Sequence, residues 1–221
     1  MPVKAPYSAQ RLTNWNGFYA GVNLGYGLGR DPTTYFSSTV GETETFKISP
    51  AGILGGGQVG YNWQFGRMVA GLESDVQATA MKDSACVFGC ILNTFFNLFG
   101  IVEQKMPWFG TTRARLGYAG DSGAVFYLTG GVAYGERQTN INHIQGISSA
   151  VVSLDDTKAG WTLGGGIEMP LYNKWSLKAE YLYMDLGSQA ISFSVGPNAN
   201  VAVTSAFREN VFRLGLNYGF N

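Results

Sequence analysis

The sequence predicts an all-β protein, an eight-stranded antiparallel up-and-down transmembrane β-barrel with short periplasmic turns and long extracellular loops. Apolar residues alternate with small or polar residues in eight segments, which is the period of a strand with two different faces. The connections between these segments alternate between short and long. Charged residues make up only 14% of the chain and glycine accounts for 31 of 221 residues, so the outer surface is not built for water.

The eight segments share one pattern, in which every second side chain is apolar. In the first segment Val22 and Leu24 fall on one face, and Asn23 and Gly25 fall on the other. Strand by strand, the apolar faces begin and end at Phe18 and Leu28, Ile53 and Phe65, Ala70 and Ala78, Trp108 and Tyr118, Phe126 and Tyr134, Trp161 and Met169, Trp175 and Tyr181, and Phe212 and Phe220. Segments of about ten residues cross a bilayer as tilted strands.

The connections and the first residues complete the expected organisation. Short connections fall near Gly66, at Asp121 to Gly123 and at Pro170 to Lys174, and long ones cover about 29–50, 81–105, 137–158 and 187–207. An even number of strands puts both termini on the short-turn side. Residues 1–14 are polar with two prolines and no apolar signal region, so we expect a flexible periplasmic N-terminal tail on a mature exported chain, followed by a barrel over 15–221.

Charge and cysteine content exclude other classes of protein. Fifteen basic residues balance fifteen acidic ones, whereas a nucleic-acid-binding protein shows a basic excess. Two cysteines are too few for a disulfide-dense scaffold or a four-cysteine zinc site. An aromatic content of 14% argues against a disordered chain.

The two faces predict that the apolar side contacts lipid. A soluble barrel with aromatic residues in its core is the alternative, but its polar face would carry scattered lysine and glutamate instead of glycine. An arginine or lysine on the lipid side costs roughly 2–4 kcal/mol at the bilayer midplane, so the charges must point inward. The expected lumen charge network is balanced and consists of Glu73, Asp75, Arg113, Arg115, Glu168, Lys178, Glu180 and Arg213.

Aromatic residues near the strand ends predict two interfacial girdles, as membrane interfaces select. The expected girdle residues are Trp15, Trp63, Trp108, Trp161, Trp175, Tyr218 and Phe220. Six basic residues near the long-loop ends could meet lipopolysaccharide phosphates, or could form ordinary ion pairs at the rim. They are Arg30, Lys82, Lys105, Arg137, Lys158 and Arg208.

Five motifs, in this order, resemble strands of the alphaproteobacterial outer-membrane β-barrel family, which includes surface antigens and haemin-binding proteins of the Rhizobiales. They are WNGFYAGVNLGYG (15–27), GGGQVGYNWQ (55–64), WFGTTRARLGY (108–118), LKAEYLY (177–183) and NVFRLGLNY (210–218). Members are similar to the membrane domain of OmpA. The resemblance implies secretory export, insertion by the barrel-assembly machinery and a place in the outer membrane of a Gram-negative bacterium.

Catalytic and cofactor signals are sparse, so we expect no enzyme, no metal site and no cofactor. The glycines at 55, 57 and 60 spell a dinucleotide fingerprint, but they lead into a strand and not into a helix. His143 is the single histidine, and with Ser148, Ser149 and Asp155 it matches no known catalytic spacing. The family resemblance leaves haem binding open, with His143 and Tyr35 as possible ligands.

The second long loop contains an uncharged stretch over 84–102. Its apolar residues, among them Phe88, Phe95 and Phe99, recur at helical spacing, and the stretch is too polar for a membrane-spanning helix. We therefore expect a short amphipathic helix that makes a protein–protein contact or packs on its own barrel. Cys86 and Cys90 would form a local disulfide in an oxidising periplasm, with two reduced thiols as the alternative.

Together these features predict a structural outer-membrane protein that stabilises the cell envelope. An eight-stranded barrel is just wide enough to be filled by its own side chains. Lateral contacts to lipopolysaccharide or to copies of the chain, as a homo-oligomer, are expected. A narrow porin-like channel and a haem- or ligand-binding surface protein are the alternatives, and a lipid-modifying enzyme is a third.

Overall fold

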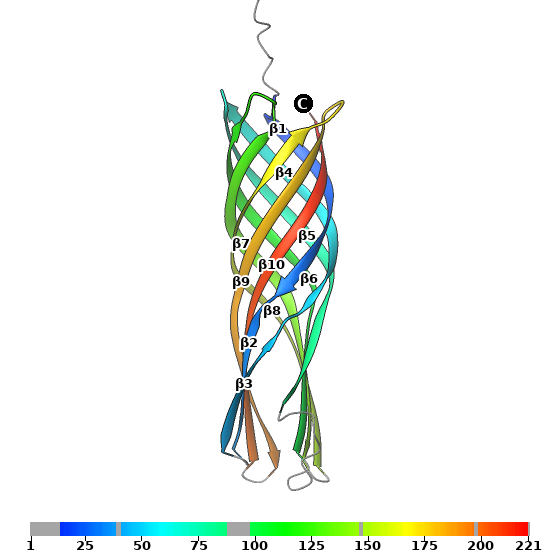
Figure 1. Cartoon of the computed structure of the whole chain (residues 1–221), viewed down its shortest axis with the longest axis vertical. Helices are drawn as coiled ribbons and strands as arrows, with labels where there is room; N and C mark the ends of the chain where they lie inside the picture. Colours follow the sequence, from blue (N-terminus) through cyan, green and yellow to red (C-terminus); the bar gives the residue numbers. More distant parts are fainter. Residues whose placement is uncertain (1–13, 39–40, 88–97, 146–147, 197–198, 221) are drawn as a thin grey trace, which may run out of the picture.

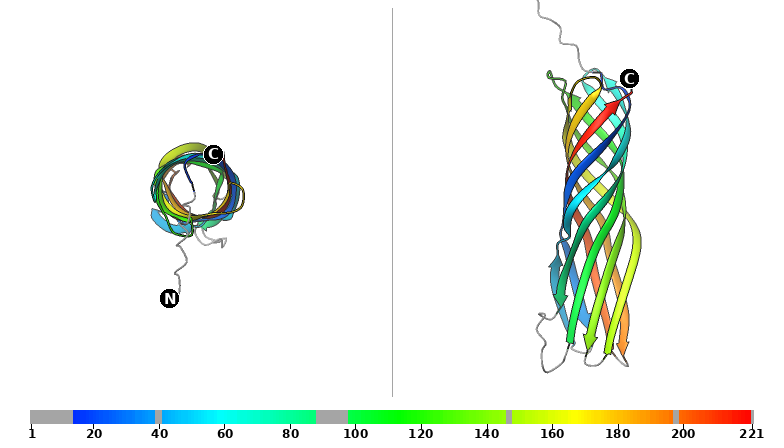
Figure 2. Two further views of the ribbon diagram at one scale, coloured as in Figure 1. Left: turned by 90° about the horizontal axis from the view of Figure 1, so that it is seen from above. Right: turned by 90° about the vertical axis from the view of Figure 1, so that its right-hand side faces the viewer.

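A computed structural model describes residues 14–38, 41–87, 98–145, 148–196 and 199–220. These residues form one antiparallel sheet that is rolled into a tall, narrow tube (Figures 1 and 2). The strands are β1 (Gly17–Gly29), β2 (Asp31–Ser37), β3 (Glu42–Ile48), β4 (Ala51–Phe65), β5 (Met68–Val87), β6 (Leu98–Ala119), β7 (Val125–Gln145), β8 (Ser148–Pro170), β9 (Trp175–Gly196) and β10 (Ala199–Gly219). None of the described residues forms a helix that could cross a membrane.

Eight of the ten strands close the ring, as the sequence predicts. β1 pairs with β4 on one side and with β10 on the other, and β4 to β10 follow one another around the wall. Short turns at Gly66, Gly123 and Asn173 connect the strands at one end of the tube, which is the upper end in Figure 1. Gly66 and Gly123 have positive φ angles of 63° and 80°, a conformation that favours glycine.

The outer surface of the ring is apolar and the inner surface is polar, which confirms the inverted arrangement. On β1 the Leu24 side chain is 67% exposed whereas Asn23 is 7% exposed, and on β7 Leu128 is 72% exposed whereas Thr129 is 4% exposed. Side chains alternate across a strand, so once one residue of a strand is known to face lipid, the inward or outward direction of all its other residues follows. The exposed apolar band, here called the apolar belt, ends toward the long-loop side at Leu28, Trp161 and Phe212.

The predicted long loops are mostly strand, which the sequence reading missed. β5 to β10 continue far beyond the apolar belt, and Asp31–Ser37 and Glu42–Ile48 pair as the β2–β3 hairpin, whose strand β2 pairs with β10. These extensions keep period two, because Thr139 and Ile141 are buried whereas Asn142 is exposed. Their outward residues are mostly polar, with Val151 and Phe36 among the exceptions, so they lack the continuous apolar outer face by which we identified strands.

The helix expected over 84–102 is wrong at both of its ends. Ser84–Val87 belongs to β5 and Leu98–Val102 belongs to β6, where Ala85 pairs with Val102. Helical spacing and strand alternation are easily confused in a short apolar run, and the neighbouring strand decides between them. Residues 88–97 lie outside the described residues.

Beyond the apolar belt the ring separates into two sheets, visible in the lower part of Figure 1. The ladder between β8 and β9 ends where Trp161 pairs with Asp185. One sheet then contains β9, β10, β2 and β3, and the other contains β5 to β8. Buried apolar residues from both sheets form what we call the sandwich core, consisting of Tyr35, Ile48, Val102, Ile141, Val201 and Val203.

The interior of the tube is layered along its axis. Near the short turns lies an inner apolar layer of Val69, Ala119, Val125 and Tyr127. Charged residues follow at the level of the apolar belt. The outer apolar layer comes next and consists of Leu54, Met81, Met106, Phe109, Ala133, Leu182, Met184, Leu186, Phe207 and Val211.

Candidate functional site

All eight predicted network residues line the lumen of the ring, and none is more than 5% exposed. They come from five strands: Glu73 and Asp75 from β5, Arg113 and Arg115 from β6, Glu168 from β8, Lys178 and Glu180 from β9, and Arg213 from β10. Each occupies an inward position between two lipid-facing neighbours. We call this set the ionic cluster.

Arg113 and Arg213 form the centre of the ionic cluster. Arg113 Nη1 lies 3.0 Å from Glu180 Oε1 and its Nη2 lies 3.0 Å from Asp75 Oδ2, and Nη2 also contacts Glu73. Arg213 donates from Nε to Glu180 Oε2 at 2.6 Å and from Nη2 to Asp75 Oδ2 at 2.8 Å. Two guanidinium groups are therefore shared among three carboxylates, and every carboxylate has a charged donor.

Lys178 and Arg115 extend the ionic cluster on either side. The Lys178 ammonium donates to Glu73 Oε1 at 2.8 Å and to Oε2 at 2.9 Å. Arg115 Nη2 donates to Glu168 Oε2 at 2.7 Å, and its guanidinium stacks over the Tyr127 ring at 4.3 Å. The cluster thus spans the lumen from β5 to β10 through direct contacts.

Two tyrosines that the sequence reading left out belong to the same cluster. The Tyr19 hydroxyl donates to Glu73 Oε2 at 2.7 Å, and the Tyr127 hydroxyl donates to Glu180 Oε1 at 2.8 Å. Both residues fall on the small and polar side of their strands, and that position could have revealed them. Thr111, Ser176 and Asn217 also donate to cluster carboxylates.

Glycine makes room for the large cluster side chains. A Cβ atom on Gly60 would lie 2.4 Å from the Tyr19 hydroxyl oxygen. Tyr19 is paired with Gly60 in the ladder between β1 and β4. The abundance of glycine on the inward face therefore reflects a lumen in which long side chains lie flat over the neighbouring strand.

The predicted girdle residues lie near both ends of the apolar belt, with one exception. Trp63, Trp161 and Trp175 are exposed on the outer surface. The Trp175 ring contacts Tyr218 at 5.2 Å between ring centroids, and Tyr218 contacts Phe220 at 5.5 Å. At the outer end the Trp108 indole donates to Glu136 Oε2 at 2.8 Å.

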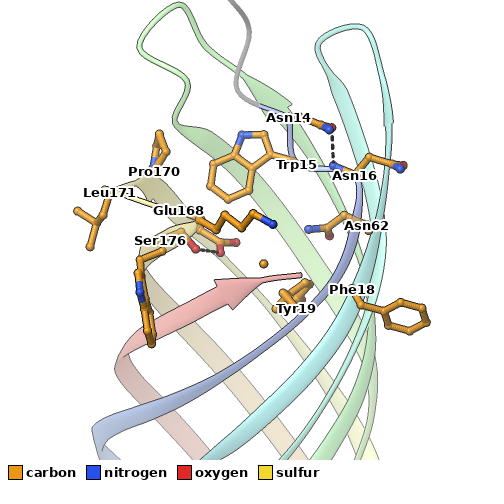
Figure 3. A pocket seen from close by; sticks show the side chains of 14 residues that line it. Asn14, Trp15, Asn16, Phe18, Tyr19, Asn62, Glu168, Pro170, Leu171 and Ser176 are labelled. Carbon is orange, nitrogen blue, oxygen red and sulfur yellow. Dashed lines mark hydrogen bonds between the residues drawn. The ribbon is translucent and has the colours of Figure 1, made fainter. Parts of the chain in front are cut away.

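Trp15 is the exception and does not belong to the girdle. Its indole lies at the mouth of the lumen, where it donates to the Gly123 carbonyl at 3.0 Å and packs against the inner apolar layer (Figure 3). A cavity of about 160 Å³ lies beneath it, lined by Tyr19, Asn62 and Glu168 among others. Trp15 precedes β1, so the strand alternation that orients the other tryptophans does not apply to it.

Several other predicted residues are only partly described. Cys86 is disulfide-bonded, and its expected partner Cys90 lies outside the described residues, so this pairing stays a prediction. Phe88 and Phe95 also lie outside the described residues. Phe99 and His143 belong to β6 and β7, and their side chains are outside the description.

Two predicted surface residues are buried. Arg137 points into the tube and is fully buried, so it is not a rim cation. Tyr35 is 1% exposed in the sandwich core, where burial raises the pKa of its phenol to about 12. A tyrosine binds iron as a phenolate, so Tyr35 is poorly placed and poorly ionised for haem. Among the described residues no group of three or more potential ligands could hold a metal ion.

A closed antiparallel ring with an apolar belt, aromatic residues at both ends and a charged interior defines an outer-membrane β-barrel protein. Residues 4–220 match the family described as outer membrane protein beta-barrel domain, and the chain belongs to this family. The protein is therefore located in the outer membrane of a Gram-negative bacterium. The family resemblance expected from the strand motifs is confirmed.

Relatives with similar sequences come from alphaproteobacteria. The 31 kDa outer-membrane immunogenic protein of Brucella melitensis is 38% identical over 99% of this chain and 88% of its own length. The 22 kDa outer membrane protein of Rhizobium leguminosarum is 29% identical over 94% of this chain and 79% of its own length. Among solved structures, the outer membrane protein OprG from Pseudomonas aeruginosa covers 94% of this chain and 99% of its own at a TM-score of 0.55 and 12% identity, which shows a shared fold.

Proposed function

We propose that the protein is a structural component of the outer membrane, with a lumen closed by its own side chains. The observation that carries this proposal is the ionic cluster, in which eight charged side chains are at most 5% exposed. The outer apolar layer lies directly beyond it, with Phe109 and Val211 fully buried. A solute would have to displace paired charges and then an apolar layer, and both steps are costly.

Conductance of the purified protein in a planar bilayer tests the closed lumen. We expect no reproducible conductance steps, and the Arg113→Ala variant serves to show that removal of a cluster side chain can create a leak. Heat-modifiable gel mobility identifies the folded fraction of each sample. Regular nanosiemens steps from the native protein would contradict the structural role and favour a porin-like channel.

The outer rim supports a lateral contact to lipopolysaccharide. Arg30 and Arg208 line a groove above the apolar residues Leu28 and Phe212, so cationic and apolar side chains lie next to each other. Arg208 Nε contacts Asp185 Oδ2 at 3.2 Å, whereas Arg30 forms no ion pair within the part of the chain that the structure describes. This arrangement suits the phosphate and acyl parts of a glycolipid.

The phosphate content of the lipid that co-purifies with the protein is a measure of this contact. We expect a lower phosphate content for Arg30→Gln combined with Lys82→Gln, since both side chains are exposed on the outer surface beyond the apolar belt. Lys174→Gln is the matched control, because Lys174 is an exposed lysine in the short turn between β8 and β9. Equal phosphate content in all three proteins would contradict the contact.

The envelope role predicts a phenotype in the cell. A strain that lacks the protein should become more sensitive to detergents, and the native gene should restore resistance. The Lys174→Gln protein should restore it fully, whereas Arg30→Gln with Lys82→Gln should restore it in part. Unchanged sensitivity of the deletion strain would contradict the structural role.

A further inference from the structure

A second set of buried charges lies beyond the apolar belt, where the ring separates into two sheets. It contains Asp31 of β2, Arg137 of β7 and Glu209 of β10, and each is 0% exposed. We call this set the neck. On β10 the last outward apolar residue of the belt is Phe212 and the outward Arg208 is exposed, so the neck lies outside the membrane-spanning segment.

The two carboxylates of the neck lack donors. Asp31 Oδ1 accepts the backbone N–H of Arg208 at 2.8 Å, but no described group donates to Asp31 Oδ2 or to either oxygen of Glu209. The Glu209 carboxylate lies against Gly29, where a Cβ atom would lie 3.0 Å from both of its oxygens. Buried carboxylates in native proteins are normally hydrogen-bonded.

No cation neutralises this pair directly. Within the described residues neither Asp31 nor Glu209 forms an ion pair, and Arg137 is 3.7 Å from Asp156 of β8 instead. The Arg137 guanidinium stacks over the Phe207 ring at 4.3 Å. The remaining charged groups near Asp31 are the outward-pointing Arg208 of β10 and Asp185 of β9, which pair with each other.

The other elements around the neck contribute no charge to it. β1 presents Gly29, and the connection between β3 and β4 presents Pro50. β5 and β6 present Met81, Gln104 and Met106 as buried side chains, whereas Lys82 and Lys105 lie on the other face of the wall. Apart from Arg137, Arg208 and Asp185, the two carboxylates are therefore surrounded by apolar and neutral groups.

We propose that Asp31 and Glu209 share protons in the neutral pH range and that their deprotonation loosens the β2–β3 hairpin from β10. The site is a proton-dependent latch on the extracellular half of the barrel. Glu209 pairs with Gly29, two residues before Asp31, so the two buried carboxylates lie at neighbouring positions inside the tube. Without a contacting cation they cannot both remain ionised at low cost.

Asp31 and Glu209 lie where β10 changes its pairing partner, so ionisation of these carboxylates would affect the contact between β10 and the β2–β3 hairpin. β10 changes its partner here, because Glu209 pairs with Gly29 of β1 whereas Ser205 pairs with Thr33 of β2. The ladder between β9 and β10 is also irregular between Ala206 and Arg208. Asp31 Oδ1 accepts a backbone N–H at this interruption, so repulsion between the carboxylates would act where the ladder is already irregular.

The direction of the pH effect follows from the carboxyl pKa values. Burial raises the pKa of Asp31 to about 7, against smaller opposing effects of the Arg208 backbone N–H and of Arg137. Burial and then the charge of Asp31 raise the pKa of Glu209 well above its ordinary value. The folded protein thus binds more protons than the unfolded chain, so stability of the hairpin is greatest in acid and is lost as pH rises through neutral.

Hydrogen exchange of the full-length protein in lipid vesicles tests the latch. The measured quantity is the exchange rate of the β2 and β3 amides in the native protein divided by their rate in Glu209→Gln at the same pH. We expect this ratio to rise as pH increases from about 6 to about 9, by roughly tenfold per pH unit at most. Comparison at equal pH removes the intrinsic dependence of exchange on pH. Asp31→Asn should behave like Glu209→Gln, since an amide retains the acceptor for Arg208.

Infrared spectroscopy and a matched control make the test specific. The native protein at about pH 7 should show a protonated-carboxyl band that Glu209→Gln weakens. Glu103→Gln, which removes a partly exposed carboxylate paired with Lys105 at 3.1 Å, should leave both measurements unchanged. Absence of the band from the native protein, an identical exchange ratio at all pH values, or a hairpin loosened by a metal chelator would each overturn the proposal.

Discussion

The barrel buries two sets of charges that differ in how they are neutralised. In the ionic cluster every carboxylate contacts at least one arginine or lysine, as when Lys178 binds Glu73 at 2.8 Å. In the neck Asp31 and Glu209 contact no cation within the described residues, although Arg137 is equally buried. Burial alone does not define a charge network. Whether buried ionised groups stabilise or destabilise the barrel wall depends on whether each carboxylate contacts a cation.

The largest effect is expected in the paired set. Arg113→Ala removes a guanidinium that contacts Glu73, Asp75 and Glu180. Only Lys178 and Arg213 then remain to neutralise these three buried carboxylates through direct contacts at hydrogen-bond distance. We expect a loss of about 3–5 kcal/mol in the free energy of unfolding. Urea-induced unfolding in lipid vesicles measures it.

An exposed ion pair provides the control for that variant. Arg67→Ala breaks a pair with Asp121 at the short-turn end, where both side chains are well exposed. Exposed pairs contribute only about 0–1 kcal/mol, so this variant should unfold almost like the native protein. Equal destabilisation by the two substitutions would show that the cluster contributes no more than a surface pair.

Neutralising one glutamate in each set should give opposite results. Glu73→Gln removes the acceptor of Lys178 and a contact of Arg113, so we expect it to destabilise the barrel by roughly 2–4 kcal/mol. Glu209→Gln relieves a buried carboxylate pair and should stabilise the protein by roughly 1 kcal/mol above neutral pH. Unfolding at about pH 8 compares both variants with the native protein.

The same sign for both glutamates would remove the distinction between the two sets. Destabilisation by Glu209→Gln at alkaline pH would mean that Glu209 has a donor that stabilises its ionised form. Stabilisation by Glu73→Gln would mean that Lys178 and the two arginines do not compensate the burial of that carboxylate.

A smaller effect, the coupling energy between Lys178 and Glu73, is expected when both members of this ion pair are replaced together. Lys178→Met alone should destabilise by about 3 kcal/mol, because it leaves Glu73 with less positive charge. Lys178→Met combined with Glu73→Gln should recover roughly 1 kcal/mol of that loss. Additive losses in this double-mutant cycle would show that the two side chains do not interact.

The membrane half of the molecule could be predicted from the sequence, because every side chain that faces lipid must be apolar or small. An apolar residue at every second position, as at Val22 and Leu24, fixes the face of each strand and with it the inward direction of Arg113 and Arg213. The contacts within the lumen could not be predicted, since they depend on how strands distant in sequence meet across the tube. Tyr19 reaches Glu73 only because the ring closes.

The extracellular half could not be predicted in the same way. Its outward residues meet water, so strands such as 137–145 look like polar loops, and Arg137 looks like a rim cation. Asp31 belongs to the β2–β3 hairpin, whose pairing with β10 no local pattern encodes. The neck arises from this long-range pairing.

Accessibility of two adjacent β7 residues tests the filled and inverted barrel most directly. Leu128→Cys and Thr129→Cys, each in a background with Cys86 and Cys90 replaced by serine, place thiols on the outer and inner faces of the same strand. In lipid vesicles we expect the thiol at position 128 to react only with a membrane-soluble maleimide. The thiol at position 129 should react with neither that reagent nor a water-soluble one. Rapid reaction of position 129 with the water-soluble reagent would show an open, water-filled lumen and contradict a barrel closed by its own charges.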